Sequence, residues 1–394
     1  SNGLEKRPKL RFPGFDEPWK ETALSSVLTE RNEYAEKDGT YEHATLSKEG
    51  IYGKTARYDR DFLVSTENKK YKVTHLGDLC YNPANLKFGV ICLNTYGDAI
   101  FSPIYVTFEI DASSDPDFIG AYLTRWDFIN RALKYQQGTV YERMAVSPED
   151  FVSIKCCFPQ KAEQTRLAEF ITLLDNRIAA QGKYVESLKK YKRGLLNKVF
   201  SNTDEKIYPT VYLSEVADFL QGLTYSPSDV ANAGHLVLRS SNIQNGTLSF
   251  DDCVYVDKSI PESLQVKCAD VIMCVRNGSK SLVGKTALIP IDMPKTTWGA
   301  FMMIVRSKLN DTYIFHYLNS QMFFSQVFKD TGTATINQIT KGILNECRLP
   351  LPPVEERKKI SKMLSTFDAK IYNAERTLYA LMETRKALLQ QLFI

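Results

Sequence analysis

Apolar residues recur in alternating steps of four and three along residues 161–200. This spacing is the heptad pattern of a helix that buries one narrow seam against another helix. Gln181 and Lys192 are the positions that interrupt it. The pattern therefore predicts one long helix, with a seam of Leu167, Ile171, Leu174, Ile178, Val185, Leu188, Leu195 and Val199.

The same heptad pattern recurs over residues 354–394. Each position of the second copy lies 193 residues after its match, as Asp368 does after Asp175, and Arg385 interrupts the seam where Lys192 does. A long repeat in register, with the same interruption, indicates an internal duplication. The second predicted seam consists of Ile360, Leu364, Phe367, Ile371, Ala374, Leu378, Leu381, Leu388 and Leu392.

A mixed region of short strand-like runs and turns precedes each predicted helix. Residues 116–135 and 311–328 are expected to be matching helical stretches, and residues 152–154 a strand before Pro159. A chain ordered domain, helix, domain, helix can bury both seams by pairing the helices antiparallel. We therefore predict an α+β protein with two globular domains at opposite ends of an antiparallel two-helix coiled coil, related by a pseudo-two-fold axis. The alternative is that each helix only caps its own domain.

Composition narrows the possible classes of protein. Hydrophobic residues make up 43% and charged residues 24%, as in globular proteins, and the net charge of +4 is too small to indicate nucleic-acid binding by itself. We expect no membrane-spanning segment, since no apolar run approaches ~20 residues, and no signal peptide at the N-terminus. The eight cysteines lack paired spacing, so we expect reduced thiols in a cytoplasmic protein and no metal site.

Two stretches resemble enzyme motifs. Residues 278–286 follow an apolar strand as a P-loop would, but five residues separate Gly278 from Gly284 where a P-loop has four. We expect a hairpin there, and an ordinary turn at Asn82-Pro83-Ala84-Asn85, which only partly matches an adenine methyltransferase motif. We predict no catalytic residue. An enzyme that binds a nucleotide or S-adenosylmethionine remains the alternative.

Polar turns recur at matching places in both mixed regions, and they carry the side chains that contact phosphates and base edges. A polar turn is usually only a solvated loop, but its recurrence in both copies favours DNA binding. The predicted DNA-binding residues of the first region are Thr45, Ser47, Lys48, Tyr141 and Arg143. Those of the second region are Arg239, Ser240, Asn242, Arg276, Asn277, Ser279, Lys280, Thr333, Thr335, Asn337 and Gln338.

With the duplicated helix, the ordered set of motifs resembles the specificity (S) subunit of type I restriction–modification enzymes over essentially the whole chain. Ala269-Asp270 departs from the Gly-Asp usual in that family, present here as Gly77-Asp78, and is expected to alter a turn. The matching motifs are Tyr81-Asn82-Pro83-Ala84-Asn85-Leu86, Phe101-Ser102-Pro103-Ile104-Tyr105, Gly222-Leu223-Thr224-Tyr225-Ser226, Leu238-Arg239-Ser240-Ser241-Asn242-Ile243, Val275-Arg276-Asn277-Gly278-Ser279 and Leu351-Pro352-Pro353-Val354-Glu355-Glu356-Arg357.

The resemblance implies a non-catalytic subunit with two target-recognition domains, residues 1–160 and 201–353, that each read one half of a bipartite site in double-stranded DNA. It implies that residues 161–200 and 354–394 are spacer helices that set the half-site spacing and dock two methyltransferase (M) subunits. S-adenosylmethionine, ATP and Mg²⁺ are then expected on the M subunits and on a further restriction (R) subunit, with no cofactor on this chain. A third interpretation is a coiled-coil scaffold that never touches DNA.

Overall fold

The computed structural model describes residues 7–54, 70–138, 144–201, 208–328 and 338–393. The chain divides into two compact units. Unit 1 consists of residues 1–180 with 378–394, and unit 2 of residues 181–377. Two long helices, α4 (Lys161–Phe200) and α9 (Val354–Leu392), each contribute one part to either unit.

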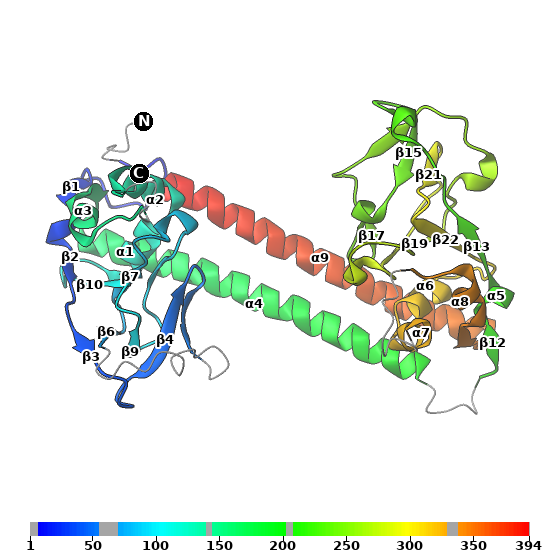
Figure 1. Ribbon diagram of the computed structural model, residues 1–394, viewed down its shortest axis with the longest axis horizontal. Coiled ribbons are helices and arrows are strands. Elements are labelled where there is room, and N and C mark those ends of the chain that lie inside the picture. Colours follow the sequence, from blue (N-terminus) through cyan, green and yellow to red (C-terminus); the bar gives the residue numbers. More distant parts are fainter. Residues whose placement is uncertain (1–6, 55–69, 139–143, 202–207, 329–337, 394) are drawn as a thin grey trace. The chain divides into compact units, whose positions relative to one another are not determined.

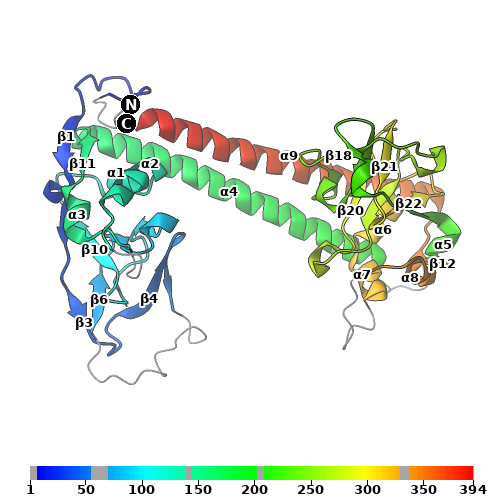
Figure 2. The same cartoon turned by 45° about the horizontal axis from the view of Figure 1, so that its top comes forward.

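Within each unit the two long helices run antiparallel, side by side in both views (Figures 1 and 2). In unit 1, Arg385 near the end of α9 pairs with Asp175 of α4, while Leu392 packs with Leu167 nearer the start of α4. In unit 2, the Gln181 amide donates to the carbonyl oxygen of Ala374 at 2.9 Å. The heptad pattern thus predicted both the helices and their direction.

Unit 1 is built on two sheets. The first has the strand order β2-β10-β7-β8 and is antiparallel throughout, and the second, β3-β6-β9-β4-β5, contains one parallel pair, β4 with β9. Helices α1 (Pro116–Leu123), α2 (Trp126–Ala132) and α3 (Pro148–Ser153) follow, and β1 pairs with β11. The strands are β1 (Lys20–Ala23), β2 (Leu28–Glu30), β3 (Tyr34–Ala35), β4 (Glu42–Ser47), β5 (Gly50–Gly53), β6 (Tyr71–Thr74), β7 (Leu79–Tyr81), β8 (Ile91–Leu93), β9 (Ala99–Phe101), β10 (Val106–Ile110) and β11 (Lys155–Phe158).

Unit 2 repeats this plan. Its antiparallel sheet has the order β13-β22-β19-β20, its second sheet, β14-β18-β15-β21, again has one parallel pair, β15 with β21, and β12 pairs with β23. The helices are α5 (Leu213–Val216), α6 (Tyr313–Leu318), α7 (Gln321–Val327) and α8 (Lys341–Glu346). The strands are β12 (Thr210–Tyr212), β13 (Ala217–Gln221), β14 (Val230–Ala231), β15 (His235–Leu238), β16 (Ile243–Gln244), β17 (Thr247–Leu248), β18 (Val254–Val256), β19 (Val271–Cys274), β20 (Thr286–Leu288), β21 (Thr296–Trp298), β22 (Met302–Ser307) and β23 (Arg348–Pro350).

Each core includes residues from the long helices. In unit 1, Ile171 of α4 and Phe393, just after α9, pack with the aromatic residues of α1, and Phe393 stacks on Phe118 at 5.6 Å between ring centroids. In unit 2, Phe200 of α4 and Leu364 of α9 belong to the same hydrophobic core as the side chains of α6. Each fully buried side chain of this size contributes roughly 1.5–3 kcal/mol, so the helix ends are anchored by hydrophobic burial.

Residues 116–135 are helical as predicted, and extended Arg125 divides them into α1 and α2. One sequence prediction of local structure is wrong. Val152 and Ser153, predicted as strand, end helix α3, and the strand begins at Lys155. The cause is a strong helix start, in which the Ser147 hydroxyl accepts from the Asp150 N–H and Pro148 occupies the first turn.

The turn before β19 also differs from expectation. Ala269 was expected to alter the turn that Gly77 makes before β7, yet both residues adopt the left-handed conformation, with φ of +66° and +88°. Both N–H groups donate to the neighbouring strand, Gly77 to Asn94 O and Ala269 to Ile289 O. The turn is conserved between the units, and Ala269 takes a backbone conformation that costs non-glycine residues roughly 1–2 kcal/mol. In the described parts of the chain, no helix combines the length and the apolarity needed to cross a membrane.

Candidate nucleic-acid interface

Three segments that the sequence singled out for DNA binding converge in unit 2. They follow β15 (residues 239–242), follow β19 (residues 276–280) and include Gln338. The Asn277 amide nitrogen donates to the Ser240 hydroxyl at 3.2 Å, and Arg276 forms an isolated β-bridge with Gln338. These contacts join loops that lie far apart in sequence into one polar surface. Thr333, Thr335 and Asn337 lie outside the described residues.

The side chains on this surface differ in their availability to a ligand. Arg239 is paired with Asp252, with 2.7 Å between Nη2 and Oδ2. Asn242 is fully buried, accepts from the Arg239 N–H, and donates to the carbonyl oxygens of Ser249 and Asp252. Asn242 therefore holds the loop together and has no free polar atom to offer DNA.

Arg276, unlike Arg239 and Asn242, is an exposed residue. Its guanidinium lies over the ring of Phe301, 5.4 Å from the centroid. Among the residues that the structure describes, Arg276 takes part in no ion pair. Ser279 and Lys280 are also exposed, and the Ser279 hydroxyl lies 2.9 Å from that of Ser281. Phe301 was not predicted as a site residue, because nothing in the sequence shows that a single phenylalanine just before a strand is 59% exposed.

The corresponding residues of unit 1 lie on the β4–β5 hairpin and beyond it. Thr45 and Ser47 are on β4, and Lys48 follows it. The Thr45 hydroxyl is 3.5 Å from that of Tyr105, and Lys48 forms an exposed ion pair with Glu49. Tyr141 and Arg143 are not among the described residues.

The β7–β8 connection of unit 1 occupies the topological position of the Arg276 loop, because β7 and β8 correspond to β19 and β20. Lys87 lies 5.2 Å above the ring of Phe88, whose side chain is 60% exposed. Both connections therefore carry a cation over an exposed aromatic ring, but the ring comes from the connection itself in unit 1 and from the residue before β22 in unit 2. The sequence analysis did not select Lys87 or Phe88, since neither lies in an obviously polar turn.

The two motifs that suggested an enzyme are structural. Residues 278–286 join β19 to β20 in an antiparallel hairpin, so no helix follows to bind a phosphate at its N-terminus. The Asn82 side chain accepts from the N–H groups of Ala84 and Asn85, as in an ordinary Asn-Pro turn. Asp270 forms a bidentate ion pair with Arg306, as Asp78 does with Arg31 in unit 1.

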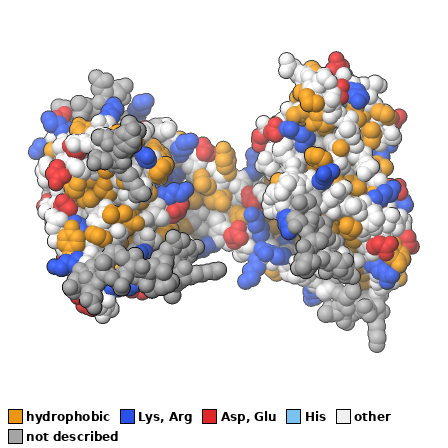
Figure 3. Space-filling view, viewed as in Figure 1, with side chains coloured by type: hydrophobic (Ala, Val, Ile, Leu, Met, Phe, Trp, Pro, Cys, Tyr) orange, Lys and Arg blue, Asp and Glu red, His pale blue; other side chains and the backbone are white. Residues whose placement is uncertain are grey.

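Two observations concern the charged groups and one thiol in the described part of the chain. No cluster of His, Cys, Asp and Glu there has the arrangement of a metal site. Burial raises the pKa of the Cys156 thiol to about 12, which keeps it protonated and unreactive. Figure 3 shows Lys and Arg side chains interspersed with acidic ones on the visible face, so any basic surface is local.

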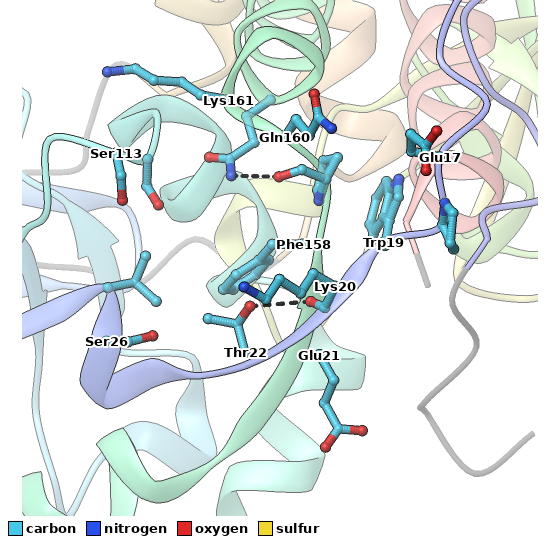
Figure 4. Close-up of a pocket in the computed structure, with 15 residues that line it drawn as sticks. Glu17, Trp19, Lys20, Glu21, Thr22, Ser26, Ser113, Phe158, Gln160 and Lys161 are labelled. Atoms are coloured by element: carbon cyan, nitrogen blue, oxygen red, sulfur yellow. Dashed lines mark hydrogen bonds between the residues drawn. The ribbon is translucent and has the colours of Figure 1, made fainter.

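A surface hollow of about 800 Å³ lies in unit 1 beside β1, β11 and the start of α4 (Figure 4). Among its lining residues, the Thr22 hydroxyl donates to Lys20 O and the Gln164 amide nitrogen to Pro159 O, and the Gln164 amide oxygen accepts from the Asp115 N–H. No predicted DNA-binding residue lines it, and its described lining has neither a histidine nor a cysteine. Its lining residues are Glu17, Pro18, Trp19, Lys20, Glu21, Thr22, Ser26, Val27, Ser113, Ser114, Phe158, Pro159, Gln160, Lys161 and Gln164.

The helix pair carries the predicted seam. Its charged interruptions form ion pairs, Lys192 of α4 with Asp368 of α9, and Arg385 of α9 with Asp175 of α4. The uncharged interruption, Gln181, donates to the carbonyl oxygen of Ala374. No predicted seam residue is exposed. Leu167, Ile171 and Leu364 are buried, and Leu174, Ile178, Leu188, Leu195, Phe367, Ile371, Leu378, Leu381 and Leu388 are half-buried.

Comparison with known proteins finds similarity in sequence and in fold. Residues 208–382 match the family model of the type I restriction modification DNA specificity domain. Over all but a few residues of both chains, the structure resembles the crystal structure of the type I restriction–modification system S subunit from M. genitalium, with a TM-score of 0.62, 98% and 99% of the two chains covered, and 17% identity. The resemblance drawn from the sequence is thereby confirmed.

Two curated relatives are the StySPI specificity subunit of Salmonella potsdam and the EcoKI specificity subunit of Escherichia coli K12. Each is 29% identical to this chain, over 173 and 166 residues. These alignments cover 42% and 40% of this chain, but only 37% and 36% of the relatives' own length.

Proposed function

We propose that this chain is the DNA-specificity subunit of a type I restriction–modification enzyme, and that each unit reads one half of a bipartite site in double-stranded DNA. The observation that carries the proposal is the convergence of the segments around Ser240, Arg276 and Gln338 into one exposed polar surface. The family match over residues 208–382 includes all three segments and supports the same function.

In this proposal, two methyltransferase subunits dock on α4 and α9, and a restriction subunit joins the assembly. The helix pair sets the distance between the two half-sites. The chain itself carries no active site and acts in the cytoplasm. S-adenosylmethionine, ATP and Mg²⁺ bind to the partner subunits, whose chemistry this chain directs to one DNA sequence.

The test is a map of adenine methylation in a bacterial host that lacks methylation of its own. We expect the methyltransferase subunit with this chain to methylate one bipartite sequence, and the methyltransferase subunit without it to methylate none. Methylation that is independent of this chain would contradict the proposal. An electrophoretic shift on random and selected duplexes, with the methyltransferase subunit present, separates a DNA reader from a scaffold that never touches DNA.

The enzyme alternative has less support, because residues 278–286 form a hairpin and Asn82 caps its own turn. Calorimetric titration of the isolated chain with ATP and with S-adenosylmethionine tests it directly. The proposal predicts no binding of either.

A further inference from the structure

The backbone around Arg276 is fixed by the strand connection that carries Phe301. The Phe301 carbonyl oxygen accepts hydrogen bonds from the N–H of Val275 at 3.0 Å and from that of Arg276 at 3.2 Å. The β-bridge to Gln338 restrains Arg276 from its other side. Surface loops are usually mobile, but hydrogen bonds to two neighbouring segments hold the backbone of Arg276 in one position.

The Phe301 ring serves no hydrophobic core. Phe301 is 59% exposed and belongs to none of the hydrophobic clusters of unit 2 that the described residues form. The Arg276 guanidinium lies over this ring, 5.4 Å from the ring centroid. A cation above an aromatic face is attracted to it, and the contact leaves the N–H groups at the edge of the guanidinium open.

Several other side chains of this surface that could read a base are already engaged, and the exposed Gln338 has the amide that suits adenine rather than guanine. Arg239 is paired with Asp252, and Asn242 is buried. Asn277 uses its amide nitrogen on Ser240 and its amide oxygen on the N–H of Ser279. Lys280 is exposed, but an ammonium lacks the planar fork that matches two acceptors at once.

A guanidinium with an open edge fits one base in particular. In the major groove, guanine presents two acceptors, O6 and N7, that a planar fork can bind together. Because the ring holds the guanidinium before DNA arrives, less conformational entropy of the side chain is lost on binding.

We propose that Arg276 reads a guanine through O6 and N7 in the half-site recognised by unit 2, and that Phe301 is the positioning residue that orients its guanidinium. This inference rests on the proposed function and deepens it. It predicts that this half-site contains at least one G·C pair.

The experiment uses the chain in complex with its methyltransferase subunit and measures Kd on duplexes in which each guanine of the half-site is replaced by 7-deazaguanine. This base keeps O6 and lacks the N7 acceptor. We expect wild type to bind one such duplex roughly 5-fold more weakly, the low end of the range for a bidentate base contact, because the hydrogen bond to O6 is kept. Arg276→Ala is expected to bind the normal and the substituted duplex equally.

The Phe301 variants test the positioning role. Phe301→Ala is expected to lose most of the preference for the normal guanine while its affinity for the 7-deaza duplex stays unchanged. Phe301→Tyr should retain the preference and Phe301→Leu should not, because only Tyr keeps an aromatic face. Phe250→Ala is the matched control, since Phe250 is also an exposed phenylalanine of unit 2 (51%) and no cation of the described residues lies over its ring.

Three results would overturn the inference: a half-site without guanine, a wild-type complex that tolerates 7-deazaguanine at every position, or an Arg276→Ala complex weakened equally on all duplexes, as for a phosphate contact. Full preference in Phe301→Ala would remove the positioning role. A wild-type complex that prefers no sequence would instead refute the proposed function itself.

Discussion

Lys192 of α4 forms an ion pair with Asp368 of α9 inside unit 2. The residues that correspond to them in the repeat, Arg385 and Asp175, form the same ion pair in unit 1 with the helices exchanged. Lys192 and Arg385 are the positions where a charge interrupts the seam. The interruptions are therefore reciprocal contacts, and they favour the antiparallel register because each cation meets the carboxylate of the other copy.

Exchanging the charges of this pair tests the register. Lys192→Glu and Asp368→Lys each place like charges together, and we expect each to lower the free energy of unfolding by about 1 kcal/mol, since the pair is half-buried. The double variant should recover most of this loss in a double-mutant cycle followed by urea unfolding. The same exchange at Asp175 and Arg385 should have a smaller effect, because those side chains are more exposed. Absence of coupling in unit 2 would argue against the register.

Unit 2 should lose stability in mild acid because of His316. This side chain is fully buried, and its Nε2 lies 3.1 Å from the Ser365 hydroxyl and 3.3 Å from that of Thr312. Burial, together with the charge of Lys192, lowers the pKa of His316 to about 3. Below pH ~6.5, His316 therefore binds a proton in the unfolded chain but stays neutral in the folded chain.

The free energy of unfolding should consequently fall as the pH drops from about 6.5 towards 3, by at most about 1.4 kcal/mol per pH unit. Asp368 faces His316, with 3.7 Å between its Oδ2 and Nδ1, and burial raises the pKa of Asp368, which opposes part of the fall. Urea unfolding of wild type and His316→Gln between pH 7.5 and 5 measures the histidine contribution. Equal pH dependence in both proteins would show that His316 does not carry it.

The left-handed conformation of Ala269 makes its replacement by glycine favourable. We expect Ala269→Gly to stabilise unit 2 by roughly 0.5–1 kcal/mol, because relief of strain outweighs the greater entropy of an unfolded glycine. The mirror change, Gly77→Ala, should destabilise unit 1 by a similar amount. Nothing lies within 4 Å of a Cβ built at Gly77, so only its φ of +88° opposes the substitution. Thermal unfolding measures both, and a destabilised Ala269→Gly would contradict the assigned strain.

The sequence predicts best what depends on long periodic patterns. A 40-residue heptad repeat indicates α4 and its partner, because many positions agree on one seam. The α3 helix was missed although its start signal, Ser147-Pro148, is visible in the sequence, because the short apolar run after it is also typical of a strand. Such short elements depend on caps and tertiary contacts more than on periodicity.

For the candidate site, the polar loops at Arg239 and Arg276 were predicted, but their roles could not be distinguished. Arg239 is neutralised by Asp252, and Arg276 is held by Phe301, 25 residues further along the chain. Both partners come into contact only through the fold. Local residue types therefore indicate where a recognition surface lies, while the availability of each side chain depends on tertiary structure.

In the proposed function, the paired helices separate two DNA-reading units by a fixed distance. Seven residues, one heptad, inserted in both helices beside Gln181 and Ala374 would keep the seam in phase and lengthen each helix by ~10 Å. At ~3.4 Å per base pair, the adenine methylation map of a host with this variant and its methyltransferase subunit should show the same two half-sites about three base pairs further apart. An unchanged gap between the half-sites would contradict the claim.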